Sequence, residues 1–243
     1  RMVDTIYWTI KTNQLYKNDI MMLDMIATAD WKRPFYFAAE NSVAHCFNVD
    51  SFCILEGWIY KLLPVKADPA DFIPGMGGVD GSGSYDLIIN KFKWGNLADP
   101  HVYVDPESLN NSLRAKTNIL RTAQALIGQK RYSDAIRLMD AYFQHFPESK
   151  FPYDMFDSPM AEMYYECGQP AKANQILLKI TDIYNQDLDY YYSFSKEYRE
   201  GFDKDIQQAL GTIRHMSILA ERFHQKALQT KIDSIFNIKI KSY

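Results

Sequence analysis

The sequence predicts a mainly α-helical protein in which helical repeats follow a small α/β segment. Three observations lead to this prediction. First, apolar residues recur at helical spacing through almost all of the chain after Asp105-Pro106. Second, the part before Asp105 mixes strand-like and turn-rich stretches. Third, the second half repeats a pattern of small and aromatic residues. We therefore expect an α/β lead segment at residues 1–104 and a helical array at residues 105–243.

The composition is that of an ordinary folded protein. Of the 243 residues, 47% are hydrophobic and 23% are charged, which is typical of globular domains and not of disordered chains. The formal net charge of −3 argues against a general nucleic-acid binder, because such a protein needs an excess of basic side chains to neutralise phosphates. Nucleic acid is therefore not expected as a partner.

Segments for membrane insertion are not evident. No stretch reaches the roughly 18 uninterrupted apolar residues that cross a bilayer, and no signal-peptide pattern follows Arg1. We expect a soluble fragment of a longer protein. Cys46, Cys53 and Cys167 form no CxxC pair, so a bridge between Cys46 and Cys53 and two reduced, packed thiols both stay open.

Three stretches at the start of the lead segment have the pattern of a regular element. Val3–Ile10 is rich in β-branched and aromatic residues and is expected to form a strand. Residues 19–31 show helical spacing behind a possible N-cap at Asn18-Asp19. Pro34 favours extended backbone before it, so residues 33–38 are expected to form a second strand that pairs with the first.

Residues 50–63 show helical spacing again, and we expect a helix that ends before Pro64. Glu56 stands beside Gly57 in this otherwise apolar stretch. Its carboxylate is therefore either partnered in the core or directed into a binding site.

Residues 68–84 are dense in glycine, proline and aspartate, and we expect a surface loop. Asp80 begins an alternation of oxygen-bearing residues that resembles a calcium loop. Tyr85 and Lys91, however, stand where that loop requires glycine and glutamate, so an ion site is not favoured.

A helix is expected from Tyr85 onward. Gly95-Asn96 would form its C-terminal cap, with Lys91 and Lys93 near the negative end of its dipole. Trp94 is the residue of this stretch that we expect to contact a ligand.

The second half contains a repeat. Aligning Ala135 with Ala173 superimposes two helix-turn-helix patterns at a spacing of 38 residues, against about 34 for a tetratricopeptide repeat, which the pattern resembles. Small residues stand where the two helices of a pair would touch, and large residues would fill the space between pairs. The residues that carry the pattern are Ala123, Tyr132, Ala135, Tyr142 and Pro147 in the first copy, and Ala161, Tyr164, Ala173 and Ile180 in the second.

A third, weaker copy is expected to start at Gly201. Ile206 replaces the alanine of the first two copies. We expect one long helix from Asp203 to about Phe236, which buries Ile206, Leu210 and Ile213, with Phe223 as a further candidate, and caps the array.

No motif of known catalytic chemistry is present. The sequence lacks a G-x-S-x-G, an HExxH and a phosphate-binding loop, so we expect no catalytic residue, no cofactor and no metal. His45-Cys46 with Cys53 lack a fourth zinc ligand at finger spacing. His145, which stands singly on a predicted helix, is expected to be solvated.

An aromatic run at Tyr190–Phe194 is a candidate binding surface. On a helix, Tyr191 and Phe194 face the same side, where they could stack on sugars or line a peptide groove. The other residues of the run point elsewhere, so at least half of the run is expected in the core.

Three blocks of the first half resemble a known family. "KNDIMMLDMIATADWKRPFYFA", "LEGWIYKLLPVK" and "YDLIINKFKWGN" look like the C-terminal extracytoplasmic part of a family of bacterial multipass membrane proteins. That family is related to the protein O-mannosyltransferases, which are glycosyltransferases of the C type. The resemblance implies a parent protein that transfers sugar from a lipid phosphosugar and a periplasmic location for this domain. It implies no catalytic residue here, because the catalytic acid of such enzymes lies in an early outer loop.

These observations lead to the expectation of a non-catalytic accessory domain beside a glycosyltransferase. Its expected partner is a protein or peptide, such as an acceptor or the parent's membrane domain, with a glycan as a further possibility. An alternative is that Trp94, Asn96 and Glu56 touch acceptor or sugar in the enzyme's active site. A third alternative is a purely structural or self-associating domain.

Overall fold

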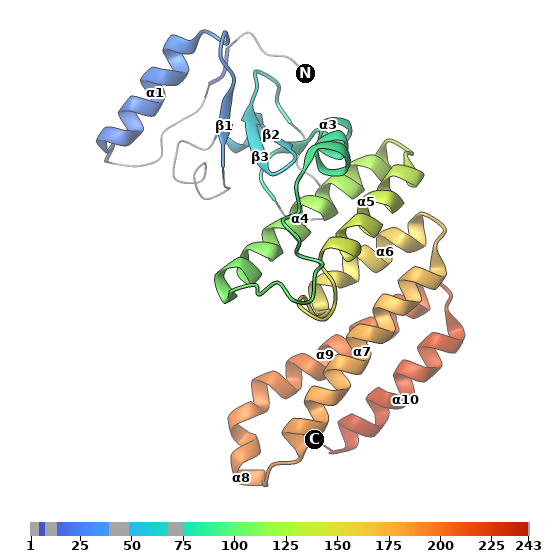
Figure 1. Cartoon of the computed structure of the whole chain (residues 1–243). Helices are drawn as coiled ribbons and strands as arrows, with labels where there is room; N and C mark the ends of the chain where they lie inside the picture. Colours follow the sequence, from blue (N-terminus) through green and yellow to red (C-terminus); the bar gives the residue numbers. More distant parts are fainter. Residues whose placement is uncertain (1–4, 8–13, 39–48, 68–74, 243) are drawn as a thin grey trace. The chain divides into compact units, whose positions relative to one another are not determined.

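The computed structural model describes residues 5–7, 14–38, 49–67 and 75–242, and it is mainly α-helical with a small sheet (Figure 1), which confirms the predicted fold class. The chain folds into two compact units, Arg1–His145 and Phe146–Tyr243. The boundary between them falls within the stretch that was predicted to form the helical array.

The first unit contains a four-stranded sheet with the strand order β1-β3-β2-β4. β2 (Cys53–Glu56) and β3 (Ile59–Leu62) form an antiparallel hairpin. β1 (Phe35–Phe37) pairs antiparallel with β3, and β4 (Gly78–Val79) pairs parallel with β2. The predicted strand at 33–38 is thus confirmed, but its described partner is β3 and not Val3–Ile10. Of Val3–Ile10, residues 5–7 form no strand and the rest lie outside the described residues.

The helix predicted at residues 50–63 is wrong. This stretch forms a short 3-10 turn, η1 (Asp50–Phe52), followed by the β2–β3 hairpin. The two-residue connection is possible because Gly57 has φ +69°, which glycine adopts without steric cost. Alternate side chains then enter the core, as in a half-buried sheet. The buried residues are Cys53, Leu55, Tyr60 and Leu62.

The predicted helix at residues 19–31 is confirmed as α1 (Lys17–Ala29). Asp19 caps it from its third position, because its carboxylate accepts a hydrogen bond from the Tyr16 backbone N–H at 2.8 Å. Met22, Leu23 and Ile26 pack against the apolar core of the sheet. One side of α1 therefore covers the sheet.

The predicted loop at residues 68–84 is wrong in its last part. β4 and the short helix α3 (Gly81–Asp86) occupy it, and Asp80 caps α3 by accepting the Gly83 N–H at 2.9 Å. A π-helical segment, η2 (Leu87–Lys91), continues α3 and ends at Lys91, since Phe92 is extended. The prediction that Gly95-Asn96 caps this helix is therefore wrong.

α4 (Pro106–Gly128) is joined to the sheet by a fully buried arginine. The Arg121 guanidinium donates to the Tyr60 hydroxyl at 3.1 Å and to the carbonyls of Met76 and Gly77 at 2.8 and 2.7 Å. These bonds join α4 to both β3 and the segment that leads into β4. They explain why α4 belongs to the unit of the sheet.

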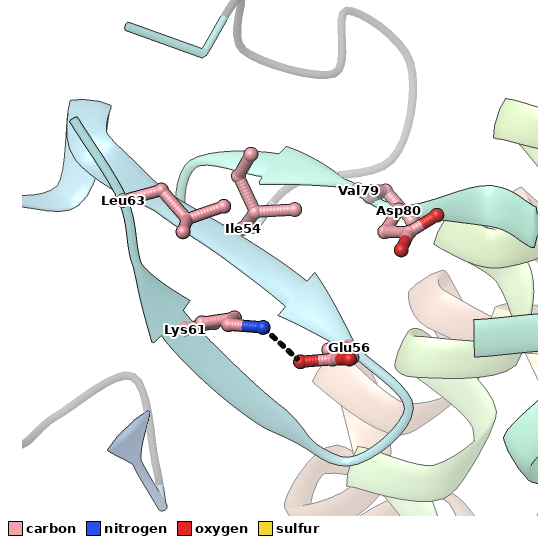
Figure 2. A pocket seen from close by; sticks show the side chains of 6 residues that line it. All are labelled: Ile54, Glu56, Lys61, Leu63, Val79 and Asp80. Carbon is pink, nitrogen blue, oxygen red and sulfur yellow. Dashed lines mark ion pairs between the residues drawn. The ribbon is translucent and has the colours of Figure 1, made fainter. Parts of the chain in front are cut away.

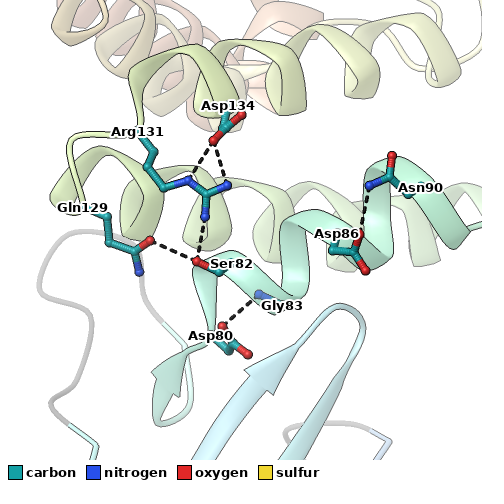
Figure 3. Close-up of polar contacts among 8 residues, drawn as sticks. All are labelled: Asp80, Ser82, Gly83, Asp86, Asn90, Gln129, Arg131 and Asp134. Carbon is teal, nitrogen blue, oxygen red and sulfur yellow. Dashed lines mark hydrogen bonds and ion pairs between the residues drawn. The ribbon is translucent and has the colours of Figure 1, made fainter.

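A second polar network holds α3 on the turn between α4 and α5 (Tyr132–His145), as Figure 3 shows. Arg131 donates from Nη1 to the Ser82 hydroxyl at 2.6 Å and pairs with Asp134 at 2.7 Å. The Ser82 hydroxyl in turn donates to Gln129 at 3.4 Å. The start of α3 is thereby tied to the helices that follow it in sequence.

The second unit consists of helices. Its first regular element is the 3-10 turn η3 (Met155–Asp157), and α6 (Ser158–Glu166) packs against α7 (Pro170–Tyr192). A short helix, α8 (Lys196–Arg199), and the 3-10 turn η4 (Glu200–Phe202) lead into α9. α9 (Asp203–Arg222) packs against both α7 and α10 (Lys226–Ser242).

The single long helix predicted from Asp203 is wrong, because the chain turns back at His224. His224 has φ +58°, so the helix ends there and α10 begins. The predicted burial of Ile206, Leu210 and Ile213 is confirmed.

Three helix pairs end their first helix in the same way. Lys130, Gly168 and His224 have φ values of +60°, +71° and +58°. In each turn the next residue donates its N–H to the carbonyl five residues earlier, which is the hydrogen bond of a Schellman motif. The first two turns are 38 residues apart, as the alignment predicted. The predicted third copy at Gly201 is wrong, since Gly201 lies in η4 and the third turn is at His224.

We expect Gly77→Ala to destabilise the protein far more than Gly95→Ala. Both glycines have left-handed backbone, but a Cβ at Gly77 would lie 2.0 Å from the Cys53 carbonyl oxygen, whereas one at Gly95 would meet nothing within 4 Å. The expected losses in free energy of unfolding are more than about 3 kcal/mol and about 1 kcal/mol. Urea unfolding of both variants measures the difference, and equal losses would contradict this account of the β4 segment.

Candidate functional site

A small pocket opens on the face of the β2–β3 hairpin that points away from the core (Figure 2). Its volume is about 200 Å³, below the roughly 300 Å³ at which pockets for drug-sized ligands begin. Such a pocket can hold a small polar group or one end of a larger ligand. Its lining residues are Ile54, Glu56, Lys61, Leu63, Val79 and Asp80.

The register of the hairpin determines which side chains reach the pocket. Ile54 pairs directly with Lys61, and Glu56 lies two residues beyond Ile54, so the three side chains share one face of the sheet. Figure 2 shows Glu56 and Lys61 directed toward each other. Glu56 thus lies on a strand and not on the predicted helix.

The charges of Glu56 and Lys61 interact across the pocket. Lys61 Nζ lies 3.5 Å from Glu56 Oε2 and 5.7 Å from the centre of the Tyr36 ring. Burial works to lower the pKa of Lys61, but the Glu56 carboxylate and the Tyr36 hydroxyl raise it. Glu56 Oε2 is buried and accepts no hydrogen bond within the described part of the chain. This oxygen can therefore accept a hydrogen bond from a donor group that enters the pocket.

Asp80 contributes to the pocket mainly through its position at the start of α3. Its carboxylate is exposed and caps that helix. In the described ranges, no three or more histidine, cysteine, aspartate or glutamate side chains gather as a metal site would require. Cys53, a candidate soft ligand by sequence, is a buried free thiol. Burial and the nearby Asp50 raise its pKa to about 12, so it is inert at neutral pH.

An aromatic cluster lies beside the tip of the same hairpin. Trp58 meets Phe92 and Trp94 edge to face, at ring-centre distances of 5.1 and 6.1 Å. The Trp94 ring stacks on the His145 ring at 4.5 Å and 8°. Gly57 permits this packing, because a Cβ there would lie 3.0 Å from the Phe92 ring. Trp58 lies two residues after Glu56 and contacts Trp94, so the pocket and the aromatic cluster are neighbours.

His145 is not the solvated histidine that its isolated position on a helix predicted. It is half-buried against Trp94 at the end of α5, and burial lowers its pKa below the ordinary value of 6.5. The neutral imidazole is therefore the favoured form in the folded protein.

The remaining candidates fall in two places. Asn96 is exposed with φ +60°, and its carbonyl accepts the Asp99 N–H at 3.0 Å, which is the geometry of a turn residue. Tyr191 and Phe194 belong to the second unit. There each ring stacks on Phe202, at 5.1 and 5.3 Å.

Sequence reasoning missed several residues of these sites. Lys61 and Trp58 were missed because residues 50–63 were interpreted as a helix. The alternation of polar and apolar residues on either side of Gly57 would have predicted a hairpin, with Lys61 beside Glu56. His145 and Phe202 had no local signal, because only the packing of distant elements brings them to Trp94 and Tyr191.

Comparison with known proteins gives a family match over the first third of the chain. The family model described as TMEM260-associated domain 2 matches residues 1–82, which include α1 and the sheet. This family is linked to TMEM260, a protein O-mannosyltransferase-like protein. No curated protein and no solved structure matches the chain. Among the helices of the described residues, none is both long and apolar enough to span a bilayer.

The lowered pKa of His145 predicts a pH-dependent contribution to stability. Below about pH 6.5 His145 binds a proton in the unfolded chain but stays neutral in the folded chain. The free energy of unfolding therefore falls as the pH drops toward the pKa of His145 in the folded state. Urea unfolding at about pH 7.5 and about pH 5.5 should show this loss in the unmodified protein and a smaller one in His145→Gln. His101→Gln, at an exposed histidine, is the control and should keep the full loss. An unchanged pH dependence in His145→Gln would refute the assignment.

Proposed function

We propose that this chain is a non-catalytic accessory domain of a membrane-bound glycosyltransferase-like protein and that it binds a protein partner. The observation that carries the proposal is the outward face of α1. Ile20, Met21 and Met25 are 56%, 55% and 55% exposed there. Because Met22, Leu23 and Ile26 already pack on the sheet, α1 presents apolar side chains on two sides.

Exposed apolar side chains on a helix favour a protein ligand. Burial of one such side chain contributes about 1.5–3 kcal/mol, and methionine adapts its flexible side chain to different partners. Met21 and Met25 are one helical turn apart, so a partner that covers one reaches the other. The face therefore suits an apolar helix or loop of another polypeptide.

The link to glycosyl transfer is supported by the first 82 residues. They match a domain that is named for its association with an O-mannosyltransferase-like protein, and α1 lies within this match. The resemblance to the outer domains of bacterial multipass proteins supports an extracytoplasmic location as part of the proposal. The matching turns of the helix pairs support tetratricopeptide-like repeats, which commonly bind extended polypeptides.

A second candidate function is favoured by the pocket. Glu56 Oε2 pairs with Lys61 but accepts no hydrogen bond from the described residues, and it lines a cavity beside the Trp58–Trp94 aromatic cluster. Sugar sites combine such an acceptor with aromatic rings. In this alternative the domain contributes acceptor or sugar contacts to the active site of the transferase.

The partner-binding proposal predicts that Met21→Glu combined with Met25→Lys removes binding without loss of stability. The two new side chains form an ion pair one turn apart and leave the net charge unchanged. A peptide array that covers envelope proteins and the outer loops of the parent protein provides the probes. We expect at least about tenfold weaker binding by the double variant, with stability within about 0.5 kcal/mol.

Ile238→Lys is the matched control, since Ile238 is an exposed apolar residue on a helix of the second unit. The proposal fails if no array peptide binds at high micromolar concentration or if the double variant binds as the unmodified chain does. Self-association that the double variant abolishes would instead support the structural alternative.

The second candidate function predicts that Glu56→Gln and Trp94→Ala each lower sugar transfer by the complete membrane protein, by about 100-fold or more. Glu107→Gln, at an exposed carboxylate on α4, should transfer normally. Transfer is measured with a lipid-linked donor after equal membrane insertion of all variants has been verified. Normal rates in both variants would reject this function and leave the α1 proposal untouched.

A further inference from the structure

The second unit carries an aromatic surface where α7 ends and α9 begins. Tyr191 and Phe194 both stack on Phe202, at ring-centre distances of 5.1 and 5.3 Å and interplanar angles of 27° and 21°. Tyr190 meets Phe194 edge to face at 5.0 Å and is 59% exposed. The rings hold one another in place, so a ligand would meet a surface that is already ordered. We call these four residues with Asp187 and Asp205 the tyrosine surface.

Two carboxylates contribute negative charge to this surface. Asp187 lies one helical turn before Tyr191 on α7, and Asp205 lies three residues after Phe202 on α9. Burial raises the pKa of Tyr191, and the charges of Asp187 and Asp205 raise it further. Neither makes an ion pair with any residue that the structure describes. Their neighbour Asp189, by contrast, pairs with Lys239. Asp205 also lies in the first turn of α9, where the helix dipole favours an acid, but Asp187 has no such compensation.

Of the three basic residues between 187 and 205, Arg199 is engaged with the backbone. Arg199 donates to the backbone carbonyls of Tyr192 and Phe194 at 3.0 and 3.3 Å, and its guanidinium lies over the Tyr192 ring at 5.2 Å. It therefore holds the turn between α7 and α8. Residues 187–205 contain six acidic and three basic side chains, so the negative charge of this end of the unit is not balanced locally.

We propose that the tyrosine surface binds a lysine or arginine side chain of a partner polypeptide. A cation above an aromatic face is attracted by the ring electrons, and a nearby carboxylate adds the opposite charge that a desolvated cation requires. A neutral sugar could use the rings and donate its hydroxyls to the carboxylates, but it would leave their negative charge uncompensated. The proposal goes beyond the proposed function, because it depends neither on α1 nor on a glycosyltransferase.

The test is a titration of the full chain with the peptide acetyl-Gly-Lys-Gly-Arg-Gly-amide, followed by the NMR signals of the tyrosine rings. We expect shifts at Tyr190 and Tyr191, a dissociation constant below about 1 mM and weaker binding at higher salt. Tyr190→Ala and Asp187→Asn should each weaken binding at least about fivefold. Tyr190 is mostly exposed and loses only its edge-to-face contact with Phe194, so its removal should lower the thermal unfolding midpoint by no more than about 4 °C.

Two controls match these variants. Tyr103→Ala removes a tyrosine that is 82% exposed in the first unit, and Asp24→Asn removes one negative charge from α1. Both should bind the peptide as the unmodified chain does. The proposal is overturned if no ring signal shifts, or if Asp24→Asn weakens binding as much as Asp187→Asn. It is also overturned if methyl α-mannoside or the norleucine analogue of the peptide shifts the same signals equally well.

Discussion

The first unit depends on the buried charge of Arg121. A guanidinium without access to water is stable only if its donors are satisfied, and here a tyrosine hydroxyl and two backbone carbonyls do this. Its Nε finds no acceptor among the described residues, and the guanidinium also lies over the Tyr60 ring at 5.9 Å. Because the three hydrogen bonds reach both β3 and the segment before β4, a single side chain sets where α4 meets the sheet. α3 packs on α4 and is held there by the Arg131–Ser82 hydrogen bond.

The pocket and the aromatic cluster take their geometry from this framework. Ser84 on α3 accepts the Gly57 N–H at 2.8 Å and donates to the Leu55 carbonyl at 3.2 Å, so one buried hydroxyl holds both sides of the hairpin tip. Glu56 lies between those two bonded residues. Its carboxylate is therefore held at the pocket by backbone bonds on either side, which is how a rigid scaffold positions a functional group.

The surfaces proposed for binding differ in chemistry and in how they are supported. The α1 face is apolar and lies in the matched part of the chain, so family and geometry support it together. The tyrosine surface lies outside that match, and only the ring contacts and the unpaired carboxylates support it. The α1 face favours an apolar partner and the tyrosine surface favours a basic one. A single partner would need an apolar segment and a basic side chain to bind at the two surfaces.

The sequence by itself determined most helices and the spacing of two helix turns, because helical periodicity and turn residues are local properties. The 38-residue spacing of the first two turns is an example: buried Ala135 and Ala173 occupy equivalent places after them. Residues 50–63 satisfied helix and strand patterns alike, and pairing with β1 and β4 decided for strands. Likewise, Glu56 and Trp94 were recognisable as candidates, but Lys61, His145 and Phe202 joined the sites only through tertiary packing. Such contacts join residues far apart in sequence, and no local pattern encodes which distant side chain fills the remaining space.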